Sequence, residues 1–357
     1  MSAWHAFRDG LRRVADAPAV LVGAWLVTLA VGLPLAAEIN RQIEDQLGDS
    51  LMAEALARGA DHDWWSELSA HAHGIATSFT PAILGFAAVL GNVSDLLDKE
   101  EILPSLAWVL AVFLVVWTFF SGGVLDRLAR QRRLYASGFF GACGGYFFRL
   151  LRLALIALGA YALLFGLLHG WLFDDLYERL THEVTVERTA LVVRVLLYGI
   201  FGLLLLVVNV IVDYARVRLV VEDRRSATGA LLAGARFVAR HAVSASGLYG
   251  LNTLLFLLLA ACYALVAPGA TWPGWLLLLI GQLWILARLA VKLQFYASAI
   301  ALFQSRLAHA RYVAAPEPRW PDSPMAEAIG RPDNPRSEAP PLTAEPSRRA
   351  VRADLRY

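Results

Sequence analysis

The stretch "VVNVIVDYARVRLVVEDRRSATGALLAGARFVARH", residues 207 to 241, changes from apolar to basic at Asp213. No charged residue lies between Arg194 and Asp213, whereas six arginines follow between positions 214 and 241. A long uncharged segment that ends in a cluster of arginines is typical of a helix that leaves a membrane on the cytoplasmic side. The stretch therefore predicts a membrane-spanning helix that ends near Asp213.

The composition of the whole chain indicates the same class of protein. Hydrophobic residues make up 58% of the 357 residues, and charged residues make up 17%, below the roughly 25% of soluble proteins. The net charge is only +2 and no nucleic-acid-binding motif is present, so nucleic acid is not a predicted partner. Cys143 and Cys262 fall in or beside apolar segments, which argues against a disulfide framework. The chain is predicted to be an integral membrane protein.

Six apolar segments are long enough to cross a bilayer, which needs about 20 helical residues. They cover residues 19 to 37, 105 to 125, 153 to 173, 190 to 212, 245 to 266 and 274 to 295. The first is longer than the apolar run of about 7 to 15 residues in a signal peptide, so it is counted as a span. Gly141 with Gly145, and Gly166 with Gly170, have the spacing that allows helix backbones to approach closely. The predicted fold is an all-α, six-span helical bundle.

The arginines of the short loops predict the orientation of the bundle. The connection after the second span carries six arginines against one acid, whereas residues 38 to 104 carry twelve acids and three basic residues. Basic loops stay in the cytoplasm, so both termini are predicted to be cytoplasmic and residues 38 to 104 to face outward from a bacterial inner membrane. This outward insert is expected to be helical, with residues 80 to 94 lying at the membrane interface.

Three segments share one plan, in which a basic amphipathic stretch precedes an outgoing span, an outer connection and a returning span. They are "FRDGLRRVADAPAVLVGAW" at 7 to 25, "GACGGYFFRLLRLALIALGAY" at 141 to 161, and "LAGARFVARHAVSASGLYG" at 232 to 250, and Arg149 aligns with Arg240. Residues 1 to 18 form the first basic segment. Arginines at this depth can reach lipid phosphate, so anionic membrane lipids are the predicted partners. The candidate headgroup contacts are Arg127, Arg130, Arg133, Arg149, Arg152, Arg236 and Arg240; simple anchoring of the topology is the alternative role.

The membrane domain is predicted to cover residues 19 to 312, with an inner-surface helix over "LFQSRLAHARY" at its end. Nine of the fifteen prolines lie in residues 313 to 357, together with balanced charges. Such a segment lacks the apolar area that would offset its ordering entropy, so a disordered cytoplasmic tail is expected.

The stretch "LVVEDRRSATGALLAGARFVARH", 219 to 241, resembles the cytoplasmic connector of a broad group of six-span bacterial inner-membrane proteins. This group includes uncharacterised families and the membrane domain fused to some glycerophosphodiester phosphodiesterases. The matching residues are Val220, Val221, Glu222, Ala230, Leu231 and Arg240, whereas the Ser-Trp pair of that group is replaced around Ala233 and Gly234. The resemblance implies a fold and a membrane location, and it implies no activity because no phosphodiesterase domain follows.

No motif of a zinc protease, a serine hydrolase or a nucleotide-binding protein occurs in the chain. The acidic and histidine-rich stretch "DHDWWSELSAHAH", 61 to 73, has no spacing that suits a metal, so neither a metal nor a cofactor is predicted. The chain is therefore not expected to be an enzyme.

Polar residues inside the predicted spans are the remaining candidates for function. They are Arg194, Asn209, Asn252, Gln282 and Arg288, and Lys292 shares a helical face with Arg288. A polar cavity lined by the three amides would favour a permease or channel subunit for a small substrate. A non-enzymatic factor that organises or supports the cell envelope through lipid headgroups is the preferred hypothesis. A second copy of the chain or another membrane protein is left open as a partner.

Overall fold

The computed structural model describes residues 2–48, 62–72, 104–132, 135–266 and 272–309, which contain helices and no strand. Six of these helices are long and apolar enough to cross a membrane. The predicted all-α, six-span fold is therefore confirmed, and the chain is an integral membrane protein. The tail from 313 to 357 and the segment from 80 to 94 lie outside the described residues, so those two predictions stay predictions.

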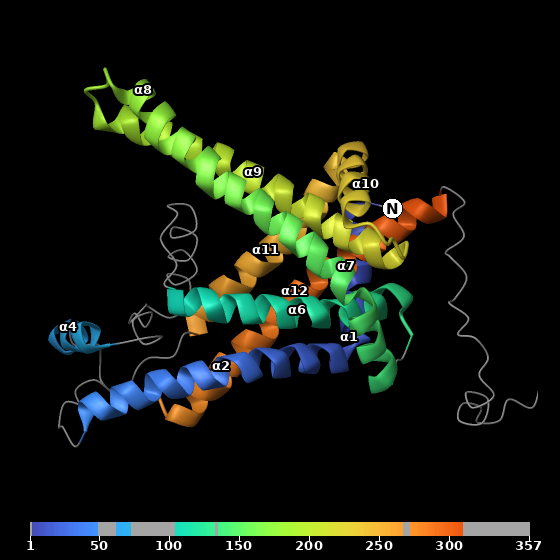
Figure 1. Cartoon of the computed structure of the whole chain (residues 1–357), viewed down its shortest axis with the longest axis horizontal. Helices are drawn as coiled ribbons and strands as arrows, with labels where there is room; N and C mark the ends of the chain where they lie inside the picture. Colours follow the sequence, from blue (N-terminus) through green and yellow to red (C-terminus); the bar gives the residue numbers. More distant parts are fainter. Residues whose placement is uncertain (1, 49–61, 73–103, 133–134, 267–271, 310–357) are drawn as a thin grey trace, which may run out of the picture. The chain divides into compact units, whose positions relative to one another are not determined.

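Figure 1 shows the helices in chain order. Their bounds are α1 Ala3–Ala15, α2 Pro18–Leu47, α4 His62–His71, α6 Pro104–Arg130, α7 Ala136–Leu163, α8 Tyr177–Thr181, α9 Glu187–Val221, α10 Ala227–Arg240, α11 Ala242–Val266 and α12 Gly274–His309. Two π-helical turns, Leu164–Leu168 (η2) and Trp171–Leu176 (η3), join α7 to α8. Each predicted span lies inside one of these helical stretches.

Local sequence signals explain several of the helix ends. Ser2 caps α1 by accepting a hydrogen bond from the His5 N–H, and Ser226 caps α10 by accepting one from the Gly229 N–H. Pro18 occupies the first turn of α2, where its missing N–H costs no hydrogen bond. Between α9 and α10, Asp223 adopts a left-handed backbone conformation with φ 48°, which reverses the chain.

The six long helices pack as three hairpins, α2 with α6, α7 with α9, and α11 with α12. The three returning helices, α6, α9 and α12, also contact one another. On each of them packs a basic segment that leads into another hairpin. The segment of α7 packs on α6, α10 packs on α9, and α1 packs on α12. The first helix of the chain thereby contacts the last, and each hairpin contacts the other two.

The predicted basic segments differ in their continuity. The first and third are separate helices, α1 and α10, whereas the middle one is continuous with its span in α7. The chain can turn after α1 because Pro18 cannot continue the previous helix, and after α10 because His241 leaves the helical conformation. No proline or comparable break occurs between Ala136 and Leu163, so the helix runs on.

A glycine or another small residue allows each basic segment to cross its returning helix closely. A Cβ atom at Gly10 of α1 would lie 2.8 Å from the backbone nitrogen of Ser298, and one at Gly234 of α10 would lie 2.9 Å from that of Ala215. In the third crossing, a Cβ at Gly123 of α6 would lie 2.6 Å from the Cys143 sulfur. Cys143 and Gly234 each precede the aligned arginines, Arg149 and Arg240, by six residues. The crossings at Cys143 and Gly234 are therefore equivalent positions of one repeat, and the crossing at Gly10 is a third close approach of a basic segment to a returning helix.

The glycine pairs predicted from spacing do not have this role. A Cβ atom at Gly141, Gly145 or Gly166 would meet nothing within 4 Å, and one at Gly170 would meet only the Asp174 side chain. The prediction of close approach at these glycines is wrong, because they lie on faces of the helix that no other described helix covers.

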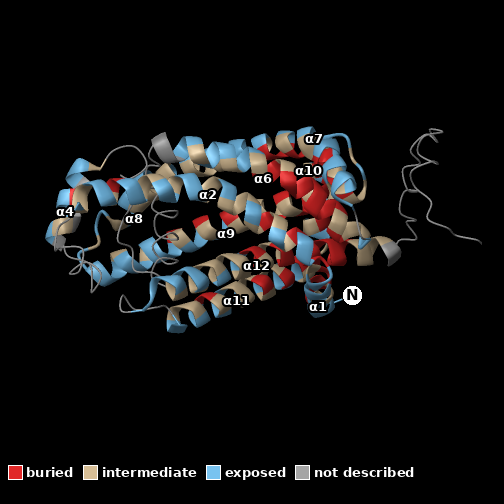
Figure 2. Ribbon diagram, turned by 90° about the horizontal axis from the view of Figure 1, so that it is seen from below, coloured by how far each residue is buried: buried red, intermediate tan, exposed pale blue. Residues whose placement is uncertain are grey.

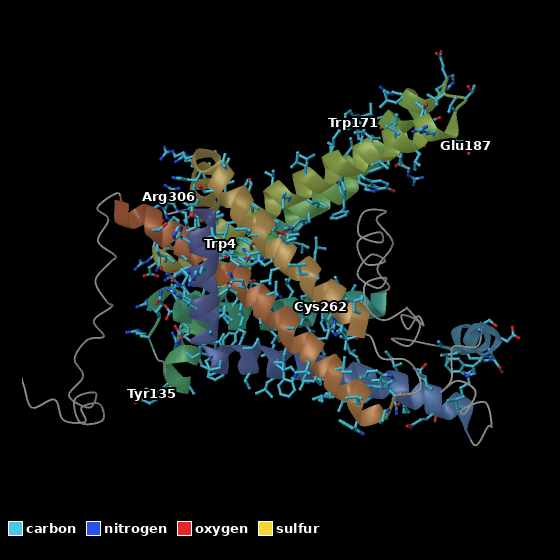
Figure 3. All side chains as sticks on the ribbon, turned by 180° about the vertical axis from the view of Figure 1, so that it is seen from behind. Trp4, Tyr135, Trp171, Glu187, Cys262 and Arg306 are labelled. Carbon is cyan, nitrogen blue, oxygen red and sulfur yellow. The ribbon has the colours of Figure 1, made fainter. Side chains whose placement is uncertain are left out.

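Buried residues gather at one end of the bundle (Figure 2). This end, called the core end below, comprises α1, α10, the first half of α7 and the adjoining ends of α6, α9 and α12. Figure 3 shows Trp4 and Arg306 at the core end and Trp171 and Glu187 at the opposite end of the α7 and α9 hairpin. Away from the core end many leucines are exposed, such as Leu26, Leu203 and Leu258. Hydrocarbon can cover such apolar side chains, as expected for spans in a bilayer.

Candidate functional site

Arg13 is the most buried cation of the described residues, with 8% of its surface exposed. Its guanidinium donates hydrogen bonds to Asp9 at 3.0 Å, to the Leu128 carbonyl at 3.1 Å and to the Gln304 side chain at 2.8 Å. Gln304 in turn donates to the Ala129 carbonyl at 2.9 Å. These bonds join α1, α6 and α12, and they satisfy carbonyls near the end of α6 that have no helical partner. Arg13 therefore has a structural role at the core end.

A second cluster lies where α6, α9 and α12 meet. The Lys292 ammonium lies 3.6 Å from the centre of the Trp117 ring, and the indole N–H of Trp117 faces the Tyr296 hydroxyl at 3.5 Å. Asp213 of α9 forms an ion pair with Arg216 at 3.0 Å and also interacts electrostatically with Lys292. A cation over an aromatic face is stabilised by the ring quadrupole, and this stabilisation is greater away from water. The cluster thus places a lysine between two aromatic residues and an ion pair where the three helices meet.

A basic groove opens on the surface between α7 and the start of α10. It has a volume of about 610 Å³ and is lined by Arg152, Leu155, Ile156, Arg225, Ser226, Ala227 and Thr228. The lining contains two arginines, two hydroxyl groups and an apolar wall from α7, and it contains no carboxylate. Within the part of the chain that the structure describes, neither arginine forms an ion pair. The groove thus offers positive charge and hydrogen-bond donors next to an apolar surface.

The other arginines predicted to contact headgroups have protein partners or project to the surface. Arg130 pairs with Asp126 at 2.7 Å, Arg149 pairs with Asp223, and Arg127 donates to the Asp16 carbonyl at 3.0 Å. Arg236 and Arg240 are exposed on α10, and Arg133 lies outside the described residues. Only Arg152 of the predicted set lines the groove, and it is joined there by Arg225, which the sequence did not single out.

The polar residues predicted inside the spans are not brought together. Asn209 accepts a hydrogen bond from the Tyr161 hydroxyl, Gln282 accepts one from the Trp25 indole at 2.8 Å, and Asn252 donates one to Ser298 at 3.0 Å. Each of the three amides thus links a different pair of helices, and they line no common cavity among the described residues. Such bonds stabilise helix pairs in a membrane by roughly 0.6 to 2 kcal/mol each.

The two arginines of the predicted intramembrane set are exposed. Arg194 stacks near the rings of Tyr177 and Tyr198, at 6.0 and 5.8 Å from their centres. Arg288 lies one helical turn before Lys292 and adds positive charge next to the lysine. The residues that sequence reasoning missed are Arg13, Trp117, Arg216, Tyr296 and Gln304. A polar residue in an apolar helix was the available signal for Gln304 and Arg216, but no spacing rule connects residues on helices this far apart in sequence.

No protein-family model, curated protein or solved structure matches the chain. The resemblance of residues 219 to 241 to connectors of six-span inner-membrane proteins therefore stays a prediction. The structure shows an integral membrane protein with two polar clusters and a basic groove at its core end.

Proposed function

We propose that the chain is a non-enzymatic support protein of a bacterial inner membrane that binds the phosphate group of an anionic phospholipid on its cytoplasmic side. The observation that carries the proposal is the basic groove between α7 and α10, where Arg152 and Arg225 lie without an ion-pair partner among the described residues. The function rests on recognition of a headgroup, and it requires no catalytic residue.

The chemistry of the groove suits a phospholipid better than a free anion. Arginine binds phosphate through two parallel hydrogen bonds, and one hydroxyl of the hydrogen-bonded pair Ser226 and Thr228 can donate a further bond. Leu155 and Ile156 form the apolar part of the lining, where an acyl chain can lie while the phosphate faces the arginines. An inorganic phosphate would gain nothing from this apolar wall.

The distribution of charge supports the cytoplasmic placement of the groove. Residues 127 to 152 and 214 to 241, at the core end, each carry six arginines, and positively charged segments of this kind remain in the cytoplasm during insertion. The cytoplasmic leaflet is the anionic one, and each basic residue near it contributes about 1 kcal/mol of attraction. A groove with two arginines at this level has the expected depth and sign of charge for an anionic headgroup.

The proposal is tested by the double substitution Arg152→Gln with Arg225→Gln. Purified protein in neutral detergent is melted with and without added phosphatidylglycerol, and phosphatidylcholine serves as the neutral lipid. We expect phosphatidylglycerol to raise the melting temperature of the original protein more than phosphatidylcholine does. The double variant should lose roughly 2 kcal/mol of this lipid-linked stabilisation because two cations are removed. High salt should weaken the effect through screening.

The matched control is Arg236→Gln with Arg240→Gln, which removes the same charge from exposed positions of α10 outside the groove. This control should keep most of the response to phosphatidylglycerol. An equal loss in both double variants would assign the response to general surface charge, and an unchanged response in the groove variant would exclude the groove as a lipid site. Stabilisation by inorganic phosphate at the same concentration would indicate a phosphate site without the lipid.

A further inference from the structure

A small cavity lies between α9, α11 and α12 at the core end. Its volume is about 20 Å³, and its polar lining consists of Asp213 and Tyr214 from α9 and Tyr249 and Asn252 from α11. A cavity holds one water molecule when this volume exceeds about 10 to 15 Å³ and when two to four polar groups face it. The size of the cavity therefore suits one water molecule and no larger ligand.

Two of the lining residues carry polar atoms without a protein partner. Asn252 is 1% exposed and Tyr214 is 3% exposed. Neither the Asn252 side-chain oxygen nor the Tyr214 hydroxyl has a hydrogen-bond partner among the described residues. Nearly all buried polar atoms in proteins are hydrogen-bonded, so two such atoms at one cavity call for a shared partner.

The orientation of the Asn252 amide is fixed by its other bonds. Its nitrogen donates to the Leu248 carbonyl and to the Ser298 hydroxyl, both at 3.0 Å. The reverse orientation would place the amide oxygen against the Leu248 carbonyl, and two acceptors cannot bond. The Asn252 oxygen is thus the free acceptor at the cavity.

We propose that this cavity is a binding site for one structural water molecule that links α9 to α11. The water accepts a hydrogen bond from the Tyr214 hydroxyl and donates one each to the Asn252 oxygen and the Asp213 carboxylate. All three bonds match the donor and acceptor character of the groups. A divalent metal cation normally takes six or more oxygen ligands, and this lining supplies too few.

The water site would add hydrogen bonds between two hairpins that already interact electrostatically through Asp213 and Lys292. The polar bond of Asn252 to another helix is directed to Ser298 of its own hairpin partner α12. Tyr214 and Asp213 belong to the preceding hairpin, because they lie on α9. A bound water would therefore extend the bond network of the third hairpin to the second at the core end.

The substitution Tyr214→Phe tests the proposal by the sign of its effect. With a bound water, loss of the hydroxyl removes a hydrogen bond, and the melting temperature should fall by about 2 °C or more. In a dry cavity the hydroxyl has no partner, so its removal should leave the melting temperature unchanged or raise it. Tyr135→Phe is the control, because Tyr135 is 89% exposed and its substitution should change nothing.

A double-mutant cycle supplies a second, independent measurement. If one water bridges both groups, Tyr214→Phe should cost less in an Asn252→Leu background than in the original protein. Additive effects would contradict a shared water. Should Asn252→Leu fail to fold, the sign of the Tyr214→Phe effect still decides. Melting in sodium, potassium and choline chloride should give equal temperatures, and stabilisation specific to sodium would assign the site to a cation and overturn the proposal.

Discussion

At the scale of single residues, the core end depends on positions where two helix backbones leave no room for a side chain. Gly10 of α1 lies against the backbone of Ser298, and Gly234 of α10 lies against that of Ala215. Backbone atoms cannot rotate away as a flexible side chain can, so an added methyl group would force the helices apart. Overpacking of this kind destabilises a protein by about 1 to 3 kcal/mol.

We expect Gly10→Ala to lower the free energy of unfolding by about 1 to 3 kcal/mol, because the new Cβ would meet the Ser298 backbone at 2.8 Å. The matched control is Gly144→Ala in α7, where a Cβ would meet nothing within 4 Å. That substitution should be neutral or stabilising by up to about 1 kcal/mol, since alanine favours a helix more than glycine does. Thermal melts in one detergent would compare the two, and equal effects would show that α1 does not pack on α12.

The sequence could not identify the glycines that matter. Gly141 with Gly145 has the small-residue spacing and is open, whereas Ala6 with Gly10 and Ala230 with Gly234 have the same spacing and are closely packed. Spacing shows which residues share a helical face, and it does not show whether that face meets another helix or lipid. The partner of the Asn252 amide is likewise set by packing, since Ser298 lies 46 residues away on another helix.

At the scale of elements, the helix α1 attaches to returning helices of two different hairpins, α6 and α12. Buried Arg13 bonds to α6 and α12, and the Gln294 side chain of α12 donates to the Phe7 carbonyl of α1 at 2.8 Å. These bonds supplement the close crossing at Gly10. The helix thus acts as the third member of a repeated arrangement, although it comes first in sequence.

The substitution Arg13→Gln tests this attachment, and Arg12→Gln on the same helix is the control. Arg13→Gln should lower the free energy of unfolding by about 1 to 3 kcal/mol, because it leaves the Leu128 carbonyl and Gln304 without their partner. Arg12 is exposed on the same helix, so Arg12→Gln removes the same charge and should change stability by less than about 0.5 kcal/mol. A similar cost at both positions would mean that charge at this helix end, and not the buried bonds, fixes α1.

The spans themselves were predictable because hydropathy and the required length of about 20 residues act locally along the chain. The extension of α9 was not predictable in the same way, because α9 continues past Asp213 to Val221, where Leu219 is fully buried in the core end. The helix predicted over residues 302 to 312 is present as far as His309, as the end of α12. Tertiary packing stabilises these extra turns, and it depends on residues from other hairpins. For the same reason the sequence predicted Arg152 as a lipid contact but not its neighbour Arg225 in the groove.

At the scale of the whole molecule, the three hairpins place all basic segments at one end. Residues 127 to 152 carry six arginines and no acid, and residues 214 to 241 carry six arginines and two acids, whereas residues 174 to 188 carry five acids and two arginines. The asymmetry therefore agrees with the arrangement of the hairpins, because alternate connections lie at opposite ends of antiparallel helices. It predicts that the core end faces the cytoplasm.

Cysteine labelling in intact cells tests this orientation on a single helix. Cys262 is exposed and is first replaced by serine, whereas Cys143 is buried and can remain. His182→Cys then places one exposed thiol before the start of α9, and Thr228→Cys places one after its end. An impermeant thiol reagent should label the cysteine at position 182 in intact cells and the one at position 228 only after the membrane is opened.

The reverse labelling pattern would contradict more than the topology. It would place the basic groove against the outer leaflet, where the anionic surface potential of the cytoplasmic leaflet does not act. Arg152 and Arg225 could still bind a phosphate by hydrogen bonds, but the general attraction that brings an anionic lipid to the groove would be absent. Melting in detergent would then still test whether the groove binds an anionic lipid, because no leaflet is present in that experiment. Labelling therefore decides which leaflet the core end faces, and the lipid-linked melting of the Arg152→Gln and Arg225→Gln variant decides whether the groove is a lipid site.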